Sequence, residues 1–164
     1  MRVQVLARLQ AVLIDCLPRA SPHAVSMALA SFKSLACRPV QLTRALDRLS
    51  DTRLLEFEPR HIANIMHALA SMRMNPGDTF LKSVMTATHL QQDSFQPAEW
   101  ANLAWSLAWF SRHSRALRYV YAQFSSTLSL LWLGEHFNHD PTPAVKHENM
   151  SIAVHRMYLD HSGL

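Results

Sequence analysis

Glycine is scarce in this sequence, with three among 164 residues: Gly77, Gly134 and Gly163. A phosphate-binding loop of the P-loop or Rossmann type needs several glycines close together, because the backbone must approach the phosphate closely. The tight turns of an all-β protein also depend on glycine. The sequence therefore excludes nucleotide binding by such a loop, and no segment has the alternating pattern of a strand.

Cysteine is also rare, since the chain contains Cys16 and Cys37 alone, and they form no Cys-x-x-Cys pair. This spacing argues against a disulfide framework or a zinc module and favours a reducing compartment. Every apolar run is interrupted by polar residues well before the roughly 18 residues that a membrane helix needs. We therefore expect no membrane-spanning segment, no metal site and no cofactor.

Motifs of known catalytic chemistry are missing as well. The sequence has no paired-carboxylate motif, no Gly-x-Ser-x-Gly and no cysteine next to a histidine. Five histidines gather in the C-terminal tail, but no His-Glu-x-x-His motif or cysteine accompanies them, which favours a polar linker over a metal site. We predict that the protein is not an enzyme.

Acidic residues are fewer than basic ones, 12 against 16, which leaves a net charge of +4. Most of the positive charge is arginine, because Lys33, Lys82 and Lys146 are the only lysines. The planar guanidinium group pairs with phosphates and stacks on bases. The charge balance permits a polyanionic partner without requiring one, and the 49% apolar composition predicts one folded domain or one continuous stack.

The sequence contains an internal repeat. Residues 57–72 align with residues 95–110 at a spacing of 38 positions, with Phe, Pro, Ala, Asn and Leu shared. A more divergent copy, residues 28–32, matches residues 68–72 at a spacing of 40, although the prolines of these two copies are 37 apart. We therefore predict that the helix of this first copy is about three residues shorter or has shifted relative to its proline.

Each copy has the pattern of two helices. Pro22, Pro59 and Pro97 stand where proline opens a helix at no cost in hydrogen bonds, and Ser21 is placed to cap the first. Apolar residues three and four positions apart then predict one buried stripe on each first helix. In the second copy these are Ile62, Ile65, Met66, Leu69 and Met72. A second helix follows each break, with Leu42, Leu46 and Leu49 replaced one repeat later by Phe80, Val84 and Ala87.

The fold class that follows is all-α. We predict an α-solenoid of antiparallel helix pairs with a period of about 38 residues over residues 1–133, comprising about three repeats and an N-terminal partial repeat. Residues 134–148 are predicted to form a polar linker, because a proline disfavours helical backbone angles at the residue before it. Residues 149–164 read as a short C-terminal helix.

The stretches Asn64 to Ala70 and Asn102 to Ala108 resemble the octotricopeptide repeat, whose hallmark is close to Pro-x-x-Leu-Ala-Asn-x-x-Trp-Ala-Leu-Ala in a repeat of about 38 residues. His67 replaces the tryptophan that Trp105 supplies, and in the first copy Ala24 and Met27 replace the asparagine and the tryptophan. The resemblance implies an α-solenoid that binds single-stranded RNA in mitochondria or chloroplasts, for RNA processing, stability or translation. Relatives akin to FAST-kinase-like proteins often end in a RAP domain, which is not visible in this sequence.

Polar residues outside the apolar stripes are the candidate RNA contacts, because bases are read by two or three side chains per repeat and cations hold the phosphates. On the first helices they are Arg60, Asn64, His67, Asn102 and Trp109, and His61 also falls outside the stripe. Where a helix pair turns, Arg112, Arg115 and Arg118 form a candidate phosphate clamp or a solvated basic edge.

Two of these assignments have structural alternatives. An asparagine repeated at one position can cap a neighbouring helix and hold the repeats in register, and we favour this role for Asn64 and Asn102. Trp100 and Trp105 are predicted to pack in the core between repeats, which leaves Trp109 as the tryptophan best placed to stack a base.

Two further functions compete with RNA binding. Helical arrays also bind peptides in their groove, so a protein-interaction scaffold is the second function class. The sequence also starts within a repeat, so a fragment of a longer repeat protein without independent activity is a third. A basic concave face favours RNA, whereas an apolar or mixed face favours a peptide.

Overall fold

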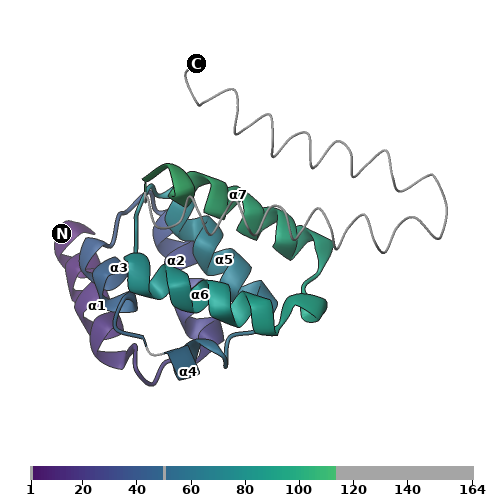
Figure 1. The fold of residues 1–164 in the computed structure, drawn as a ribbon. Helices are drawn as coiled ribbons and strands as arrows, with labels where there is room; N and C mark the ends of the chain where they lie inside the picture. The colour runs from purple at the N-terminus through teal and green to yellow at the C-terminus, as the bar shows by residue number, and fades with distance from the viewer. Residues whose placement is uncertain (1, 50, 114–164) are drawn as a thin grey trace, which may run out of the picture. The chain divides into compact units, whose positions relative to one another are not determined.

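The computed structural model of the protein describes residues 2–49 and 51–113, which are helical and contain no strand (Figure 1). The predicted all-α class is therefore confirmed for this part of the chain. The predicted linker and C-terminal helix, and Arg115 and Arg118, lie outside it. The elements are α1 (Arg2–Cys16), α2 (Pro22–Ser34), α3 (Val40–Leu46), α4 (Asp51–Leu54), α5 (Pro59–Ser71), α6 (Asp78–Leu90), the 3-10 helix η1 (Gln92–Ser94) and α7 (Pro97–His113).

The chain divides into two compact units, Met1–Ser106 and Leu107–Leu164, and α7 contributes to both. Within the first unit, α2 packs against α5 and α1 packs against α3. Helix α6 contacts both α4 and α5. None of the helices in the described ranges has the length and apolar character needed to cross a membrane.

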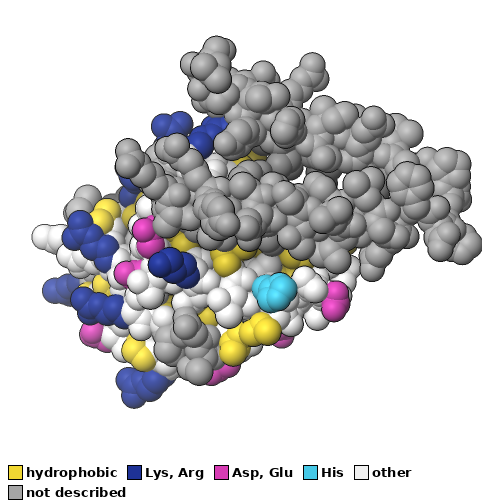
Figure 2. Space-filling model, viewed as in Figure 1, with side chains coloured by type: hydrophobic (Ala, Val, Ile, Leu, Met, Phe, Trp, Pro, Cys, Tyr) yellow, Lys and Arg dark blue, Asp and Glu magenta, His cyan; other side chains and the backbone are white. Residues whose placement is uncertain are grey.

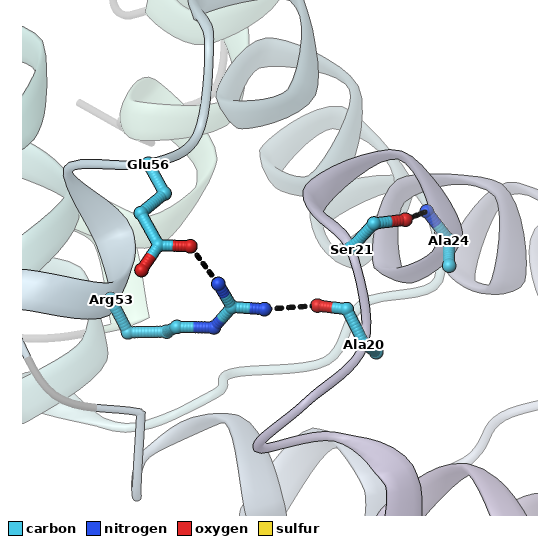
Figure 3. Close-up of polar contacts among 5 residues, drawn as sticks. All are labelled: Ala20, Ser21, Ala24, Arg53 and Glu56. Atoms are coloured by element: carbon cyan, nitrogen blue, oxygen red, sulfur yellow. Dashed lines mark hydrogen bonds and ion pairs between the residues drawn. The ribbon is translucent and has the colours of Figure 1, made fainter.

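Three helices begin at the prolines predicted to open them: α2 at Pro22, α5 at Pro59 and α7 at Pro97. Ser21 caps α2, because its Oγ accepts a hydrogen bond from the backbone N–H of Ala24 at 3.2 Å (Figure 3). The residue before α5 is Glu58, which has a similar extended backbone but no side-chain cap. Proline therefore starts the first helices with or without a cap.

The hydrogen bond from Ala24 N–H to Ser21 Oγ predicts that removal of the Ser21 hydroxyl destabilises the protein. Replacing Ser21 by alanine leaves one N–H at the start of α2 without its acceptor, and we expect a loss of about 1 kcal/mol in the free energy of unfolding. Urea denaturation followed by circular dichroism measures this loss. The matched control is Ser31→Ala, because the exposed Ser31 hydroxyl only bonds back to the carbonyl of Met27, within its own helix. Equal stability of both variants would argue against the cap.

Helices α2 and α5 have the same length of 13 residues, and their ends correspond at a spacing of 37. After each helix one residue takes a left-handed conformation, Ala36 at φ +50° and Arg73 at φ +55°. The following N–H then bonds to the helix, from Cys37 to Phe32 O at 2.9 Å and from Met74 to Leu69 O at 3.0 Å. This ending satisfies the last carbonyl groups in the same way twice.

The equal ends correct the predicted alignment of the first copy. The helix is neither shorter than α5 nor shifted relative to its proline. A spacing of 40 differs from the observed spacing of 37 by three residues. The sequences still match at 40, because residues three positions apart on a helix belong to the same apolar stripe. With the spacing of 37, Met27 rather than Ala24 takes the place of Asn64.

The apolar residues predicted to face the core do so. All five residues of the predicted stripe on α5 are buried, with exposed fractions of 8% or less. So are the corresponding residues around α3 and α6: Leu42, Leu46, Leu49, Phe80, Val84 and Ala87. Helix α1 differs, because Val5, Leu9 and Val12 form an exposed apolar stripe along it.

The second helix of the first copy is interrupted, whereas α6 is continuous. Helix α3 ends at Leu46, and the bonds from Arg48 N to Ala45 O and from Leu49 N to Leu46 O form a tight turn. This turn places Asp47 beside the start of α6, where its Oδ1 accepts a hydrogen bond from Phe80 N at 3.0 Å. Helix α6 thus receives its cap from a residue 33 positions earlier in the sequence.

Arg53 joins the end of α4 to the segment that precedes α2 (Figure 3). Its Nη2 donates a hydrogen bond to the carbonyl oxygen of Ala20, and its Nη1 donates to Oε2 of Glu56. The side chain is partly buried, so this charged group satisfies a carbonyl just before the cap of α2.

Candidate nucleic-acid interface

The first helices present a repeated solvent-facing stripe. On α5 the stripe consists of Arg60, Asn64, His67 and Ser71, which are exposed or half-buried. Their spacing of four, three and four residues places them on one side of the helix. Three of these residues are among the predicted RNA contacts.

The neighbouring first helices carry the same stripe at corresponding positions, and the three stripes together are called the first-helix face. On α2 it consists of His23, Met27, Ala30 and Ser34, and on α7 within the first unit of Ala98, Asn102 and Trp105. All of these residues are exposed or half-buried. Helix α2 packs against α5, and His67 of α5 contacts Trp105 of α7. The stripes therefore lie next to one another.

Acidic residues are almost absent from these helices. Helices α2 and α5 contain no Asp or Glu, and Glu99 is the one acidic residue in the sequence of α7. The Glu99 carboxylate caps its own helix, because its Oε2 accepts a hydrogen bond from Gln96 N at 2.8 Å. By contrast, on the side where α3 and α6 lie, Figure 2 shows basic side chains gathered near α1 and α3 with acidic ones among them.

One cation, Arg60, lies on the first-helix face, and another, Lys33, lies next to this face in the sequence of α2. Lys33 is half-buried near the end of α2, and Arg60 is exposed at the start of α5. Arg60 Nε lies 2.9 Å from Glu58 Oε2, and both side chains are about 60% exposed. Such a surface ion pair holds little free energy, so the Arg60 guanidinium can exchange Glu58 for a phosphate at small cost.

The side-chain amides of the two repeated asparagines lack the hydrogen-bond partner that a capping role requires within the described residues. Asn64 is exposed and Asn102 is half-buried. Within the described residues neither side-chain amide makes a hydrogen bond, and Asn102 engages only its backbone carbonyl, which accepts from Ser106 Oγ at 2.6 Å. The capping role favoured from the sequence would need a carbonyl partner, and the described part of the chain supplies none. Both amides keep one acceptor and two donors for a ligand.

Trp100 and Trp105 were predicted to pack in the core between repeats, but both are only half-buried. Trp105 is half-buried and meets His67 edge to face, with ring centroids 5.2 Å apart. Trp100 is also half-buried and stacks on Phe95, with centroids 4.4 Å apart. Trp105 corresponds to His67 one repeat later, so its side chain lies where the helix faces solvent. Apolar character alone had suggested the core.

Trp109 and Arg112 belong to the second unit. Trp109 is half-buried and meets Phe110 edge to face, with centroids 5.0 Å apart. Arg112 is half-buried as well. The candidate phosphate clamp is described at Arg112 only, because its other two arginines lie outside the described residues.

His61, predicted to lie outside the apolar stripe of α5, is buried with 6% of its surface exposed. Its ring lies against that of His23 on α2, with centroids 6.1 Å apart. Neither ring nitrogen of His61 has a hydrogen-bond partner within the described residues. Burial is the main cause that lowers the pKa of His61 below its ordinary value of 6.5, and it outweighs the opposing effect of the Glu58 carboxylate.

The lowered pKa of His61 predicts a pH dependence of stability. Because the folded state holds the proton more weakly than the unfolded state, this contribution to stability is complete above about pH 7 and is lost as the pH falls through 6.5 toward the folded pKa. We expect the urea midpoint to fall between about pH 7.5 and pH 5.5, and His61→Phe to reduce that fall. His89→Gln, a change at an exposed position on α6, should keep the wild-type decline. An unchanged decline in His61→Phe would contradict this explanation.

In the described ranges, no three His, Cys, Asp or Glu side chains come together in a way that could hold a metal ion. The chain matches no protein-family model, no curated protein and no solved structure. The described part of the chain is α-helical, with an acid-poor, solvent-facing stripe on adjacent helices.

Proposed function

We propose that the protein is an RNA-binding helical-repeat module of the octotricopeptide type, which holds single-stranded RNA on the first-helix face. The observation that carries this proposal is the recurrence of one solvent-facing stripe without carboxylates on three neighbouring helices, with Asn64 and Asn102 at corresponding positions of two of them. The resemblance adds the expected setting, which is RNA processing, stability or translation in mitochondria or chloroplasts. In this proposal the protein binds RNA and catalyses no reaction.

The packing supports a solenoid with a period of about 38 residues. First helix packs on first helix, α2 on α5, and the helix that precedes α2 packs on the helix that follows it, α1 on α3. The starts of α2, α5 and α7 are 37 and 38 residues apart. A helix pair of this size cannot bury its apolar stripe alone, so neighbouring pairs stack and leave one continuous face for a ligand.

The first-helix face is mixed rather than continuously basic, and its lack of carboxylates is the feature that favours RNA over a peptide. Phosphates repel carboxylates, and the first helices have only Glu99, which caps its own helix. The Asn64 and Asn102 amides can pair with the edges of unstacked bases. A peptide helix would need apolar anchors at regular spacing, and on this face Met27 is the only large aliphatic side chain. With about three first helices, about three bases are contacted, so we expect modest affinity.

The test is selection of the purified chain against a random pool of single-stranded RNA, washed at low and at physiological salt with duplex DNA as competitor. Enrichment of a short motif that survives the higher salt would support base reading. Retention at low salt alone would reduce the proposal to phosphate attraction. If a chain shown to be helical by circular dichroism retains no RNA at either salt, the proposal is wrong, and the protein-interaction scaffold becomes the better interpretation.

A further inference from the structure

Two side chains, from α5 and α7, meet on the first-helix face, and a lysine lies on the neighbouring helix α2. His67 of α5 touches Trp105 of α7, with ring centroids 5.2 Å apart and ring planes at 61°. Lys33 of α2 lies close enough to His67 that its charge adds to burial in lowering the pKa of the imidazole. All three side chains are half-buried, so each combines a packed base with a solvent-accessible part.

This arrangement has the parts of a single-strand subsite. Both rings are only half-buried, so part of their surface stays accessible to a further ring. Stacking of a nucleobase on an aromatic side chain is sequence-tolerant and strong enough to dominate binding at one nucleotide. The Lys33 ammonium, on the adjoining helix, supplies the charge that the phosphate of that nucleotide requires.

The packing also gives rigidity that a surface aromatic residue usually lacks. His67 and Trp105 lie near the middle of helices of 13 and 17 residues, and each is held by the ring of the other. A fully buried residue adjoins each of them in the sequence, Met66 beside His67 and Ser106 beside Trp105. A preorganised ring loses little side-chain entropy when a base stacks on it.

We propose that Lys33, His67 and Trp105 form a subsite for one stacked nucleobase and its adjoining phosphate. The inference rests on the proposed single-strand RNA binding, and it adds Lys33 and Trp105 to the residues expected from the sequence. His67, whose pKa lies below 6.5, is uncharged at neutral pH and acts there as an aromatic wall of the subsite.

The experiment measures binding of the full chain to fluorescein-labelled oligouridylate and oligoadenylate of about 20 nucleotides at low salt. Trp105→Leu should weaken binding of both about tenfold, and Trp105→Phe should restore most of the loss because it restores an aromatic face. Lys33→Gln should reduce the slope of log affinity against log salt by about 0.7, the value for one single-strand phosphate contact.

The matched control is Trp100→Leu, which changes the same residue type on the same helix. Trp100 is also half-buried, but its ring stacks on Phe95. Binding by Trp105→Leu equal to that of the wild type, while changes at Asn64 and Asn102 weaken it, would overturn the subsite and leave the proposed function intact. Equal losses in Trp105→Leu and Trp100→Leu, or no rescue by Trp105→Phe, would also overturn it. Failure of the wild type to bind either oligonucleotide would instead reject the proposed function together with the subsite.

Discussion

Replacing Asn64 and Asn102 together by alanine should weaken single-stranded RNA binding about tenfold or more and change the preferred bases. Each amide can donate to and accept from a base edge, and a hydrogen bond of this kind contributes about 1 kcal/mol. The melting temperature should not fall below that of the wild type, because neither amide makes a hydrogen bond within the described residues and alanine favours a helix. Filter binding and selection with the double variant measure both effects.

The control for this variant is Gln41→Ala, which removes an exposed amide from α3, away from the first-helix face. It should leave both affinity and base preference unchanged. The opposite pattern in the double variant, with unchanged RNA binding and a clearly lowered melting temperature, would show that the asparagines hold the helices in register. That result would restore the structural role favoured by the sequence.

Gly77→Ala should lower the free energy of unfolding by about 3 kcal/mol, the largest stability effect expected from a single added methyl group in this protein. Gly77 has φ +112° and ψ 155°, a conformation that is accessible essentially to glycine alone. A Cβ at this position would lie 2.4 Å from Oδ1 of Asp47. The substitution therefore strains the backbone and also displaces the carboxylate that caps α6 at Phe80.

A double-mutant cycle separates these two causes. Asp47→Ala alone should cost about 1 to 2 kcal/mol, the usual loss for a helix cap. If the clash with Asp47 carries much of the cost, the double variant Gly77→Ala/Asp47→Ala will be more stable than the sum of the single losses predicts. Additive losses would assign the cost of Gly77→Ala to backbone strain. A loss below about 0.5 kcal/mol for Gly77→Ala would contradict both explanations. Urea denaturation measures all three variants.

The helices themselves could be predicted because their signals are local. Proline has its φ angle set by its own ring and needs no N–H partner at a helix start, so Pro22, Pro59 and Pro97 mark three starts wherever the helices later pack. The spacing of Ile62, Ile65 and Met66 places them on one side of a helix by backbone geometry alone. Burial of these residues then follows from the need to remove apolar surface from water.

The register of the first copy could not be predicted in the same way. An apolar stripe matches itself after a shift of three residues, so a spacing of 40 fits the sequence nearly as well as 37. The left-handed residues Ala36 and Arg73 end the two helices and so fix the alignment of the first copy with the second. Neither residue is glycine, the residue type from which such a conformation is usually predicted. A comparison that started from the prolines would have placed Met27 opposite Asn64 and pointed to the correct stripe.

The candidate interface was predicted in part. Arg60, Asn64, His67 and Asn102 lie on the face expected for them, since the exposed side of a helix is the complement of its apolar stripe. His61 is buried against α2, and Trp105 is only half-buried. The Lys33 charge helps to lower the pKa of His67 because α2 packs on α5, which brings together helices whose residues 33 and 67 are 34 positions apart. Such proximity leaves no pattern in the sequence.

By itself, the sequence determined that the described part of this protein is helical, where its first helices begin and which of their sides is apolar, because proline geometry and helical spacing act within a few residues. The tertiary structure alone decided that Asp47 caps α6, that Gly77 must accommodate that carboxylate, and that His67 and Trp105 meet, with α2 and its Lys33 packed against α5. These contacts join residues 30 or more positions apart, and their geometry is set by the packing of one helix on the next.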